Sequence, residues 1–399
     1  MELNEKRLSV ALITLFLLLA CCFATAQESI WRLDRQRLLG DLGGARTRWE
    51  EKGFTWDLVY TGEVFMNTRG GINTSDSEEY RGDVSLFLTL DTGQAGWWQD
   101  GVFFMHLQEG HGQGITDDHA GDFQVVSNID ADDFKQVSEF WYLHSFFEDR
   151  LWIKLGKQEA NADFAFVDYG VEFINSSPGF SPTIPMPSYP DQDWGLVIGT
   201  APNDWFSANL GIYQGRPNGG RSIGDTLDNL HGPMTILEPA FHYDLSGNPG
   251  HLRLGGWWHG DKFEELDDPG GTSENYGFYL TWDQQLWLEN PGVDEQGIGL
   301  FAQYGWAPED LNEAGQYFGL GMQWTGPVPR RDEDIAGLGV FSVDFSGEAG
   351  FEDDAETAIE LFYSTPVFGW LSLKPDLQYI INPGGAGNDD ALAIGLRLQ

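Results

Sequence analysis

Hydrophobic and polar residues alternate one by one along most of this chain. In residues 54–60 large apolar side chains stand at every second position, and similar alternation recurs at 315–325 and 391–398. A period of two is typical of a strand with one apolar and one polar face. The pattern predicts about 16 strands, over residues 54–67, 82–91, 101–110, 137–147, 150–158, 193–200, 204–214, 234–245, 251–259, 275–288, 297–306, 315–325, 336–346, 355–365, 370–381 and 391–398.

The connections between these strands tend to alternate in length. Long connections are expected at 68–81, 111–136, 159–192, 215–233 and 260–274. Short ones are expected at 148–149, 201–203, 246–250 and 366–369, whereas 289–296 and 326–335 are longer than the alternation predicts. Short periplasmic turns and long external loops are typical of outer-membrane barrels, whose strands need about 9–11 residues to cross a bilayer. An even strand number places both termini on the periplasmic side.

A secreted soluble β-sandwich also alternates, but its loops need not sort by length. Charged, amide and imidazole side chains recur on the second face of the predicted strands, which favours a barrel with a polar lumen. A sheet that spans lipid must close, because every backbone group there needs a partner. We therefore expect 391–398 to pair with 54–67. Leu392, Ile394, Leu396 and Leu398 should then face lipid, and Arg397 should face the lumen.

The N-terminal residues have the pattern of an export signal. Lys6 and Arg7 precede an apolar run over 8–20, and small residues lead up to Ala26. The run is shorter than the roughly 20 residues of a spanning helix. We predict a signal peptide over 1–26, a periplasmic segment with a short helix over 27–53 and a barrel over 54–399. Both cysteines fall within the signal, so the exported chain carries no disulfide, which points to a bacterial envelope.

The net charge is −40, from 62 acidic and 22 basic residues. This charge makes nucleic acid and anionic membrane surfaces poor partners, and we expect no nucleic acid partner. Many acids fall in predicted loops, such as Asp130, Asp132 and Asp133. They resemble only a fragment of a calcium loop, without a glutamate at its twelfth position. We interpret them as a solvated surface and predict no metal and no cofactor.

Five passages, in order over nearly the whole exported chain, carry a resemblance to a known family. They are LLGDLGGARTRWEEKG (38–53), GKQEANADFAF (156–166), EFINSSPGFSPTIPMPSYP (172–190), YGWAPEDLN (304–312) and LSLKPDLQYIINPGG (371–385). In them the chain resembles the carbohydrate-selective porins of the OprB family. The resemblance implies a 16-stranded barrel that passes mono- and small oligosaccharides by diffusion and is narrowed by inward-folded loops. Barrels of this kind usually end on an aromatic residue that the barrel-assembly machinery recognises, whereas this chain ends on Leu398-Gln399.

The longest predicted connection, 159–192, is also the most proline-rich. Each proline fixes φ and lowers the entropy lost when a loop takes one conformation. A loop folded into a barrel has to hold a fixed aperture, and we predict this role for 159–192. Candidate aperture residues are Asn161, Asp163, Phe164, Asn175, Ser176, Ser177 and Phe180.

A sugar channel needs aromatic rings to stack on sugar C–H faces and polar groups to replace lost water bonds, with binding weak enough to release. Candidate lumen residues on the polar strand faces are Lys154, Gln158, Arg253, Trp257, His259, Lys374, Asp376 and Gln378. Lys or Arg facing lipid at the midplane would cost about 2–4 kcal/mol, so Lys154, Arg253, Lys374 and Arg397 are expected inside. One hypothesis pairs them across the lumen with acids such as Glu356 and Glu360.

The sequence therefore predicts a passive, non-enzymatic porin of the bacterial outer membrane. Its expected partners are small neutral sugars, outer-membrane lipid and, during insertion, the barrel-assembly machinery, and it could act as a monomer or a trimer. Two alternatives stay open. One is a secreted polysaccharide-active enzyme with two carboxylates about 5–9.5 Å apart. The other is a general porin without sugar preference.

Overall fold

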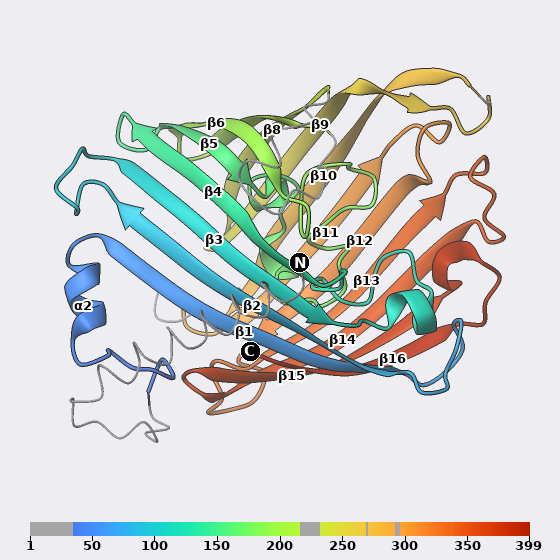
Figure 1. The fold of residues 1–399 in the computed structure, drawn as a ribbon, viewed down its shortest axis with the longest axis horizontal. Helices are drawn as coiled ribbons and strands as arrows, with labels where there is room; N and C mark the ends of the chain where they lie inside the picture. The colour runs from blue at the N-terminus through green and yellow to red at the C-terminus, as the bar shows by residue number, and fades with distance from the viewer. Residues whose placement is uncertain (1–34, 216–231, 269, 292–295) are drawn as a thin grey trace, which may run out of the picture.

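The chain forms a closed antiparallel barrel of 16 strands in which sequence neighbours pair and β1 pairs with β16 (Figure 1). The structure, a computed structural model, describes residues 35–215, 232–268, 270–291 and 296–399. The predicted signal, 1–26, lies outside the described residues. None of the helices within the described ranges has the length and apolar character needed to cross a membrane.

All of the predicted strands are present, and the predicted fold class is confirmed. The strands are β1 Phe54–Asn67, β2 Glu78–Asp91, β3 Gly101–Gly112, β4 Phe134–Phe146, β5 Leu151–Gln158, β6 Asp193–Asn203, β7 Phe206–Gln214, β8 Pro233–Leu245, β9 Asn248–Glu264, β10 Thr272–Leu288, β11 Gly297–Trp306, β12 Ala314–Thr325, β13 Ile335–Phe345, β14 Ala355–Phe368, β15 Leu371–Ile381 and β16 Ala391–Leu398. The helical segments are α2 Ala45–Glu50, η1 Thr116–Ala120, η2 Ala160–Ala162, η3 Asp168–Gly170 and η5 Pro383–Gly385.

One predicted connection is wrong. Residues 260–274 were expected to form a long loop, but β9 and β10 continue as a ladder until Glu264 pairs with Thr272. Only 265–271 remains as a connection. The extension carries charged residues such as Lys262 and Glu274, which form an exposed ion pair, so its alternation no longer marks an apolar face. The hairpin therefore rises beyond the apolar part of the barrel.

The two faces of the strands have opposite chemistry. In β15, the exposed Pro375 and Leu377 alternate with Asp376 and Gln378, which are buried inside the barrel. Exposed aromatic residues gather at the end with the short turns, as expected for an interfacial girdle. They include Trp97, Trp98, Phe147 and Trp205. The outer surface is thus suited to lipid, and the inner surface is polar.

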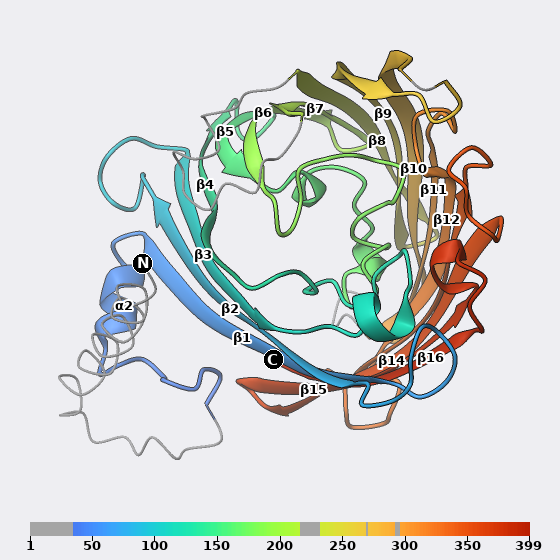
Figure 2. The same cartoon turned by 45° about the vertical axis from the view of Figure 1, so that its right-hand side comes forward.

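Two connections fold into the barrel instead of extending from it (Figure 2). We call residues 113–133 the short inner loop and residues 159–192 the long inner loop. The first carries η1, and the second carries η2 and η3. A 16-stranded barrel is too wide for wall side chains alone to fill. The inner loops therefore determine how much of the lumen stays open.

The barrel closes at a seam where β16 is the shorter strand. Leu398 pairs with Gly62, so the first residues of β1 extend past the end of β16. Arg46 of α2 covers part of this edge, since its guanidinium donates to the Trp56 carbonyl at 2.6 Å and stacks on the Trp56 ring. The last residue is also fastened, because Gln399 and Ser372 exchange two backbone hydrogen bonds.

The cross-strand pair Glu63–Arg397 yields a prediction about the seam. The two side chains are buried directly opposite each other, with Arg397 Nη2 2.8 Å from Glu63 Oε2. Arg397→Met leaves a buried carboxylate without its partner and should lower the free energy of unfolding by about 3–5 kcal/mol. Urea titration of the barrel in lipid vesicles measures this change.

The matched control is Glu50→Gln, which breaks the exposed pair between Arg37 and Glu50. Exposed pairs contribute about 0–1 kcal/mol, so this variant should unfold almost like the wild type. The double variant with Glu63→Leu and Arg397→Met should regain much of the loss. Wild-type stability of Arg397→Met alone would show that the pair does not hold the seam.

Candidate pore and constriction

Two apolar clusters fix the long inner loop to the barrel wall. Phe173 inserts its ring between Phe301, Phe341 and Phe362, with ring centroids 5.0–5.5 Å apart. On the other side of the lumen, the loop residue Phe164 is fully buried in a second cluster that contains Tyr213. Interdigitated rings of this kind leave little room for a rigid shift. The loop is therefore anchored at two distant points of the wall.

Carboxylates of β14 accept backbone N–H groups from both inner loops. Glu360 accepts from Ile174 at 2.6 Å and from Asn175 at 3.0 Å. Glu356 accepts from Phe123 at 2.7 Å and from Gln124 at 2.9 Å. An irregular loop buried away from water leaves N–H groups unpaired, and each unpaired group costs about 1–3 kcal/mol. The two glutamates supply those missing acceptors.

The predicted partners of the lumen cations are therefore wrong. Lys154, Arg253, Lys374 and Arg397 all lie inside the barrel, as predicted, but none of them pairs with Glu356 or Glu360. Lys154 pairs with Asp163, and Lys374 pairs with Glu172 at 2.6 Å. For Lys154 and Lys374, an acid of the long inner loop is the ion-pair partner, whereas Arg397 pairs with Glu63 on the neighbouring strand β1.

Arg253 joins the wall and the long inner loop in the same manner. Its guanidinium lies 2.8 Å from Asp283 on β10 and 3.4 Å from Asp168 of η3, and it also donates to the Phe166 carbonyl. Asp283 in turn accepts the backbone N–H of Tyr169 at 3.2 Å. Charge pairing and backbone pairing thus fasten the same turn of the loop.

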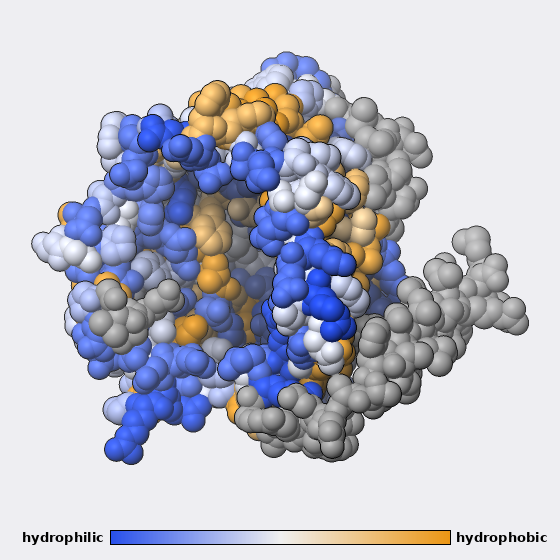
Figure 3. All heavy atoms as spheres, turned by 90° about the vertical axis from the view of Figure 1, so that its left-hand side faces the viewer, coloured by the Kyte–Doolittle hydropathy of each residue, from blue (hydrophilic) through white to orange (hydrophobic). Residues whose placement is uncertain are grey.

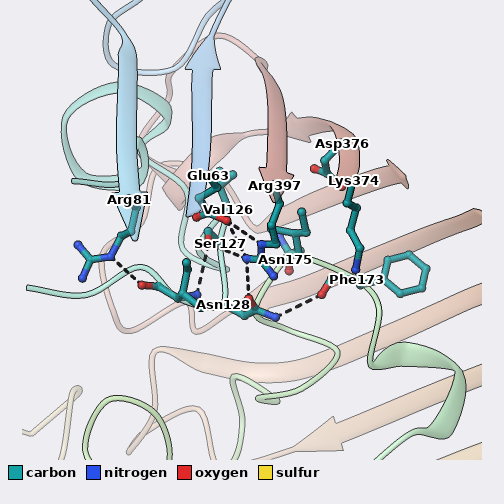
Figure 4. A network of polar contacts seen from close by, with 12 residues as sticks. Glu63, Arg81, Val126, Ser127, Asn128, Phe173, Asn175, Lys374, Asp376 and Arg397 are labelled. Atoms are coloured by element: carbon teal, nitrogen blue, oxygen red, sulfur yellow. Dashed lines mark hydrogen bonds and ion pairs between the residues drawn. The ribbon is translucent and has the colours of Figure 1, made fainter. Parts of the chain in front are cut away.

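The two inner loops also bind each other beside the seam (Figure 4). Arg397 donates to Asn128 at 2.8 Å and to Ser127 at 3.2 Å. Asn128 donates from its side chain to the Phe173 carbonyl and from its backbone to the Ile174 carbonyl. The closing strand, the short inner loop and the long inner loop therefore form one hydrogen-bonded unit.

Several predicted site residues are buried in these attachments. For example, Asn175 of the long inner loop donates to Gln378 on β15, whereas Gln158 donates to the Gly195 carbonyl at 2.7 Å and so joins the wall strands β5 and β6. The fully or nearly fully buried members of the predicted set are Gln158, Phe164, Asn175, Ser177, Trp257, His259, Asp376 and Gln378. The members with more accessible surface are Asn161, Asp163, Ser176, Phe180 and Arg253. Lys154 and Lys374 are largely covered by their ion pairs.

An aromatic row on the inner wall was not predicted. Phe87, Phe104 and Trp141 lie side by side on β2, β3 and β4, with ring centroids 6.2 Å and 4.8 Å apart. The three rings are half-buried, and neither loop-docking cluster includes them. Phe87 stands between Ser85 and Thr89 on the polar face of its strand. In the sequence, a large aromatic residue on the polar face of a strand was the signal that could have revealed this row.

The row lies toward the end of the barrel with the short turns. Lys154 places its ammonium group 5.3 Å from the Trp141 ring centre, and Trp141 donates its indole N–H to Glu139 at 3.1 Å. Seen from this end, the molecule is hollowed at its centre, with a largely hydrophilic rim and hydrophobic residues inside (Figure 3). The opening thus combines ring surfaces with hydrogen-bonding groups.

A closed barrel of 16 strands with loops docked in a polar lumen has the architecture of an outer-membrane porin. The family model for carbohydrate-selective porins of the OprB family matches residues 76–399, and the chain belongs to this family. It is similar to porin B of Pseudomonas aeruginosa, with 25% identity over 91% of this chain and 90% of that protein.

Solved structures show the same fold. The chain matches the high-pH structure of Pseudomonas putida OprB with a TM-score of 0.85 and 23% identity, over 93% of this chain and 99% of that one. It matches the low-pH structure of the same protein with a TM-score of 0.62 and 21% identity, over 92% and 98% of the two chains. The chain is therefore an outer-membrane channel protein by family and by fold.

Glu360 provides a test of how the long inner loop is held. In Glu360→Gln, one carboxylate oxygen becomes an NH₂ group that faces a backbone N–H, so the loop loses an acceptor with a net contribution of about 1.5–3 kcal/mol. We expect frequent current fluctuations in planar bilayers, because residues near Ile174 leave the wall transiently. Glu109→Gln, in an exposed pair with Lys135, is the control and should give steady currents. Steady currents in Glu360→Gln would contradict an anchoring role.

We expect the docking of the short inner loop to depend on pH through Asp130. Burial raises the pKa of Asp130 to about 6, although Arg81, 3.8 Å away, partly opposes the shift. A raised pKa means that the docked loop favours the protonated acid. Docking should therefore be strongest below about pH 4, the usual range of an aspartate, and should weaken as the pH rises through 6.

Asp130→Asn should remove this dependence, because asparagine stays neutral. Hydrogen–deuterium exchange of residues 113–133 should be alike in the two proteins at pH 4. At pH 8 it should be slower in the variant. Comparing the proteins at the same pH cancels the intrinsic pH dependence of exchange. Equal exchange at both pH values would show that the ionisation of Asp130 is not coupled to docking.

Proposed function

We propose that this protein provides a passive diffusion path for neutral mono- and small oligosaccharides across the outer membrane into the periplasm. The observation that carries the proposal is the two-point docking of the long inner loop, with Phe173 and Phe164 buried in separate wall clusters. A loop held in this way sets a fixed aperture, and solutes pass it according to their size and their interactions with the walls. Family membership supports sugars as the solutes.

The proposed sugar contacts are the accessible groups along this path. Phe87, Phe104 and Trp141 offer ring surface, and Arg253 and Asp163 offer hydrogen bonds to hydroxyl groups. From the predicted aperture set, Asn161, Ser176 and Phe180 also retain accessible surface. Among the buried members, Asn175 helps to position the loop, whereas Gln158 donates to Gly195 on the neighbouring wall strand. Individual contacts of this kind are weak, which allows a sugar to leave as readily as it enters.

Two further proposals concern assembly, and one measurement gives the oligomeric state. The signal over 1–26 is removed after Ala26, and the N-terminal sequence of the purified protein tests this. The barrel-assembly machinery inserts the chain despite its Leu398-Gln399 end, and depletion of that machinery should lower the amount of folded barrel. In an open-channel recording, closure in one step indicates a monomer and closure in three steps indicates a trimer.

Liposome swelling tests the function directly. Proteoliposomes should swell faster in glucose or maltose than in an amino acid of similar size. Equal rates for sugars and the amino acid would support the general porin instead and contradict the sugar preference. Absence of swelling with every solute would contradict the porin itself.

Trp141→Ala sharpens this test. Loss of an aromatic contact costs about 0.5–1.5 kcal/mol, so sugar swelling should slow by about two- to tenfold relative to the amino acid. The control is Phe140→Ala, the adjacent residue on the lipid-facing side of β4, which should leave the ratio unchanged. A ratio that stays the same in Trp141→Ala would remove the aromatic row from the sugar path.

A further inference from the structure

A cavity of about 800 Å³ lies between the long inner loop and the β9–β10 hairpin. One wall is the proline-rich stretch of the loop, residues 180–191, and the other is the part of the hairpin that extends beyond residue 260. Its lining includes Phe180, Met186, Tyr189, Phe263, Glu264 and Thr272. The cavity lies toward the long-loop end of the barrel, away from the aromatic row on β2–β4.

Phe180 differs from the other phenylalanines that fix the loop. Phe164 and Phe173 are 0% and 2% exposed, whereas Phe180 is 38% exposed. The two docking clusters do not include it. An exposed ring that the fold does not use for packing, placed in a cavity wall, offers an apolar surface to a ligand.

A second ring beside Phe180 is held in a fixed orientation. Tyr189 donates its hydroxyl to the Ile129 carbonyl at 2.7 Å, and its ring meets Phe134 edge to face at 5.7 Å. On the opposite wall, Phe263 packs edge to face against His259 at 4.9 Å. The cavity therefore presents aromatic surface from both of its walls.

Polar groups stand between these rings. Glu264, at the end of the β9 ladder, supplies carboxylate acceptors, and Lys262 supplies a donor near its ion-pair partner Glu274. Ser188 also lines the loop wall, but its hydroxyl already donates to Glu159 and Asn161 within the loop. Rings that cover C–H faces, together with donors and acceptors for hydroxyl groups, fit a carbohydrate. The carboxylates disfavour a phosphorylated or otherwise anionic ligand.

The loop wall is rigid before any ligand arrives. Ile184 and Met186 are buried in the second docking cluster, and Gln136 donates to the Pro190 carbonyl at 2.8 Å. The prolines of the stretch fix their own φ angles. A wall in this state loses little entropy on binding, so even modest contacts yield measurable affinity.

We infer that this cavity is an outer binding site for a neutral saccharide of at least two rings, occupied before the sugar reaches the constriction. The inference rests on the proposed function. The volume lies in the upper part of the range of about 300–1,000 Å³ that drug-sized ligands fill, and a single hexose would leave much of it empty. Two aromatic walls also suit a ligand that extends beyond one ring.

The test is the block of ion current by maltose and by glucose in planar bilayers. Phe180→Ala should raise the half-blocking concentration of maltose by about three- to tenfold and change that of glucose by less than about twofold. Phe180→Trp should retain the wild-type value, because tryptophan also offers a ring. The control is Phe147→Ala, which removes a 75%-exposed ring at the short-turn end and should change neither sugar.

Glu264→Gln tests the site from the opposite wall, without altering the loop. It should raise the half-blocking concentration of maltose, as Phe180→Ala does. The conductance without sugar should stay at its wild-type value. Unchanged maltose block in both variants, with block intact in the wild type, would overturn the outer site and leave the porin function standing. Equal loss in Phe180→Trp and Phe180→Ala would also overturn it. A wild-type protein that neither conducts nor passes any sugar would instead refute the proposed function.

Discussion

Backbone hydrogen bonding in lipid is the constraint on which this structure depends. A spanning sheet cannot leave an edge, because an unpaired N–H or C=O group in hydrocarbon costs several kcal/mol. Here the edge disappears where β16 pairs with β1, from Gly62 opposite Leu398 to Asn67 opposite Ala393. Closure fixes which side chains point outward and which point inward. The chain end is therefore a structural element, and even Gln399 is hydrogen-bonded to its neighbour Ser372.

Closure also creates the interior that the inner loops have to fill. A barrel of this width holds a water-filled lumen unless chain enters it. Irregular chain brings unpaired N–H groups with it, and wall carboxylates accept them at several places. Glu238 accepts from Ala165 at 2.8 Å, in addition to Glu356 and Glu360 on β14. Part of the large acid content thus has a structural use inside the barrel and is not only a solvated surface.

The local alternation of residues predicted the strands. It could not predict contacts between residues that lie far apart in the sequence. Alternation located all the strands, because lipid on one side and a polar lumen on the other act on every residue. The pairing of Lys374 with Glu172 could not be read in this way, since it depends on where a loop settles more than 200 positions along the chain. The hairpin extension to Glu264 was missed because its outward residues meet water.

The same difference applies to the candidate site. Resemblance to a family and the prolines located the inner loop 159–192, but not which of its residues face the open lumen. Asn175 and Ser177 look like hydroxyl-binding groups in the sequence, yet both are buried in contacts that hold the loop. Phe87 was overlooked because leucines at 86, 88 and 90 already explained the apolar face of β2. A polar residue in a buried loop and a ring on a polar face both need three-dimensional contacts to be interpreted.

The paired charges of the lumen bear on why such a channel suits neutral solutes. Lys154, Arg253 and Lys374 each have a carboxylate of the long inner loop beside them. The field of two opposite charges a few ångströms apart falls off much faster with distance than that of an isolated charge. Lys154 and Lys374 are largely covered by these pairs, so we expect them to act on a passing sugar mainly through the field of the pair. Because that field is weak along the axis, the pairs should not turn the lumen into a trap for ions.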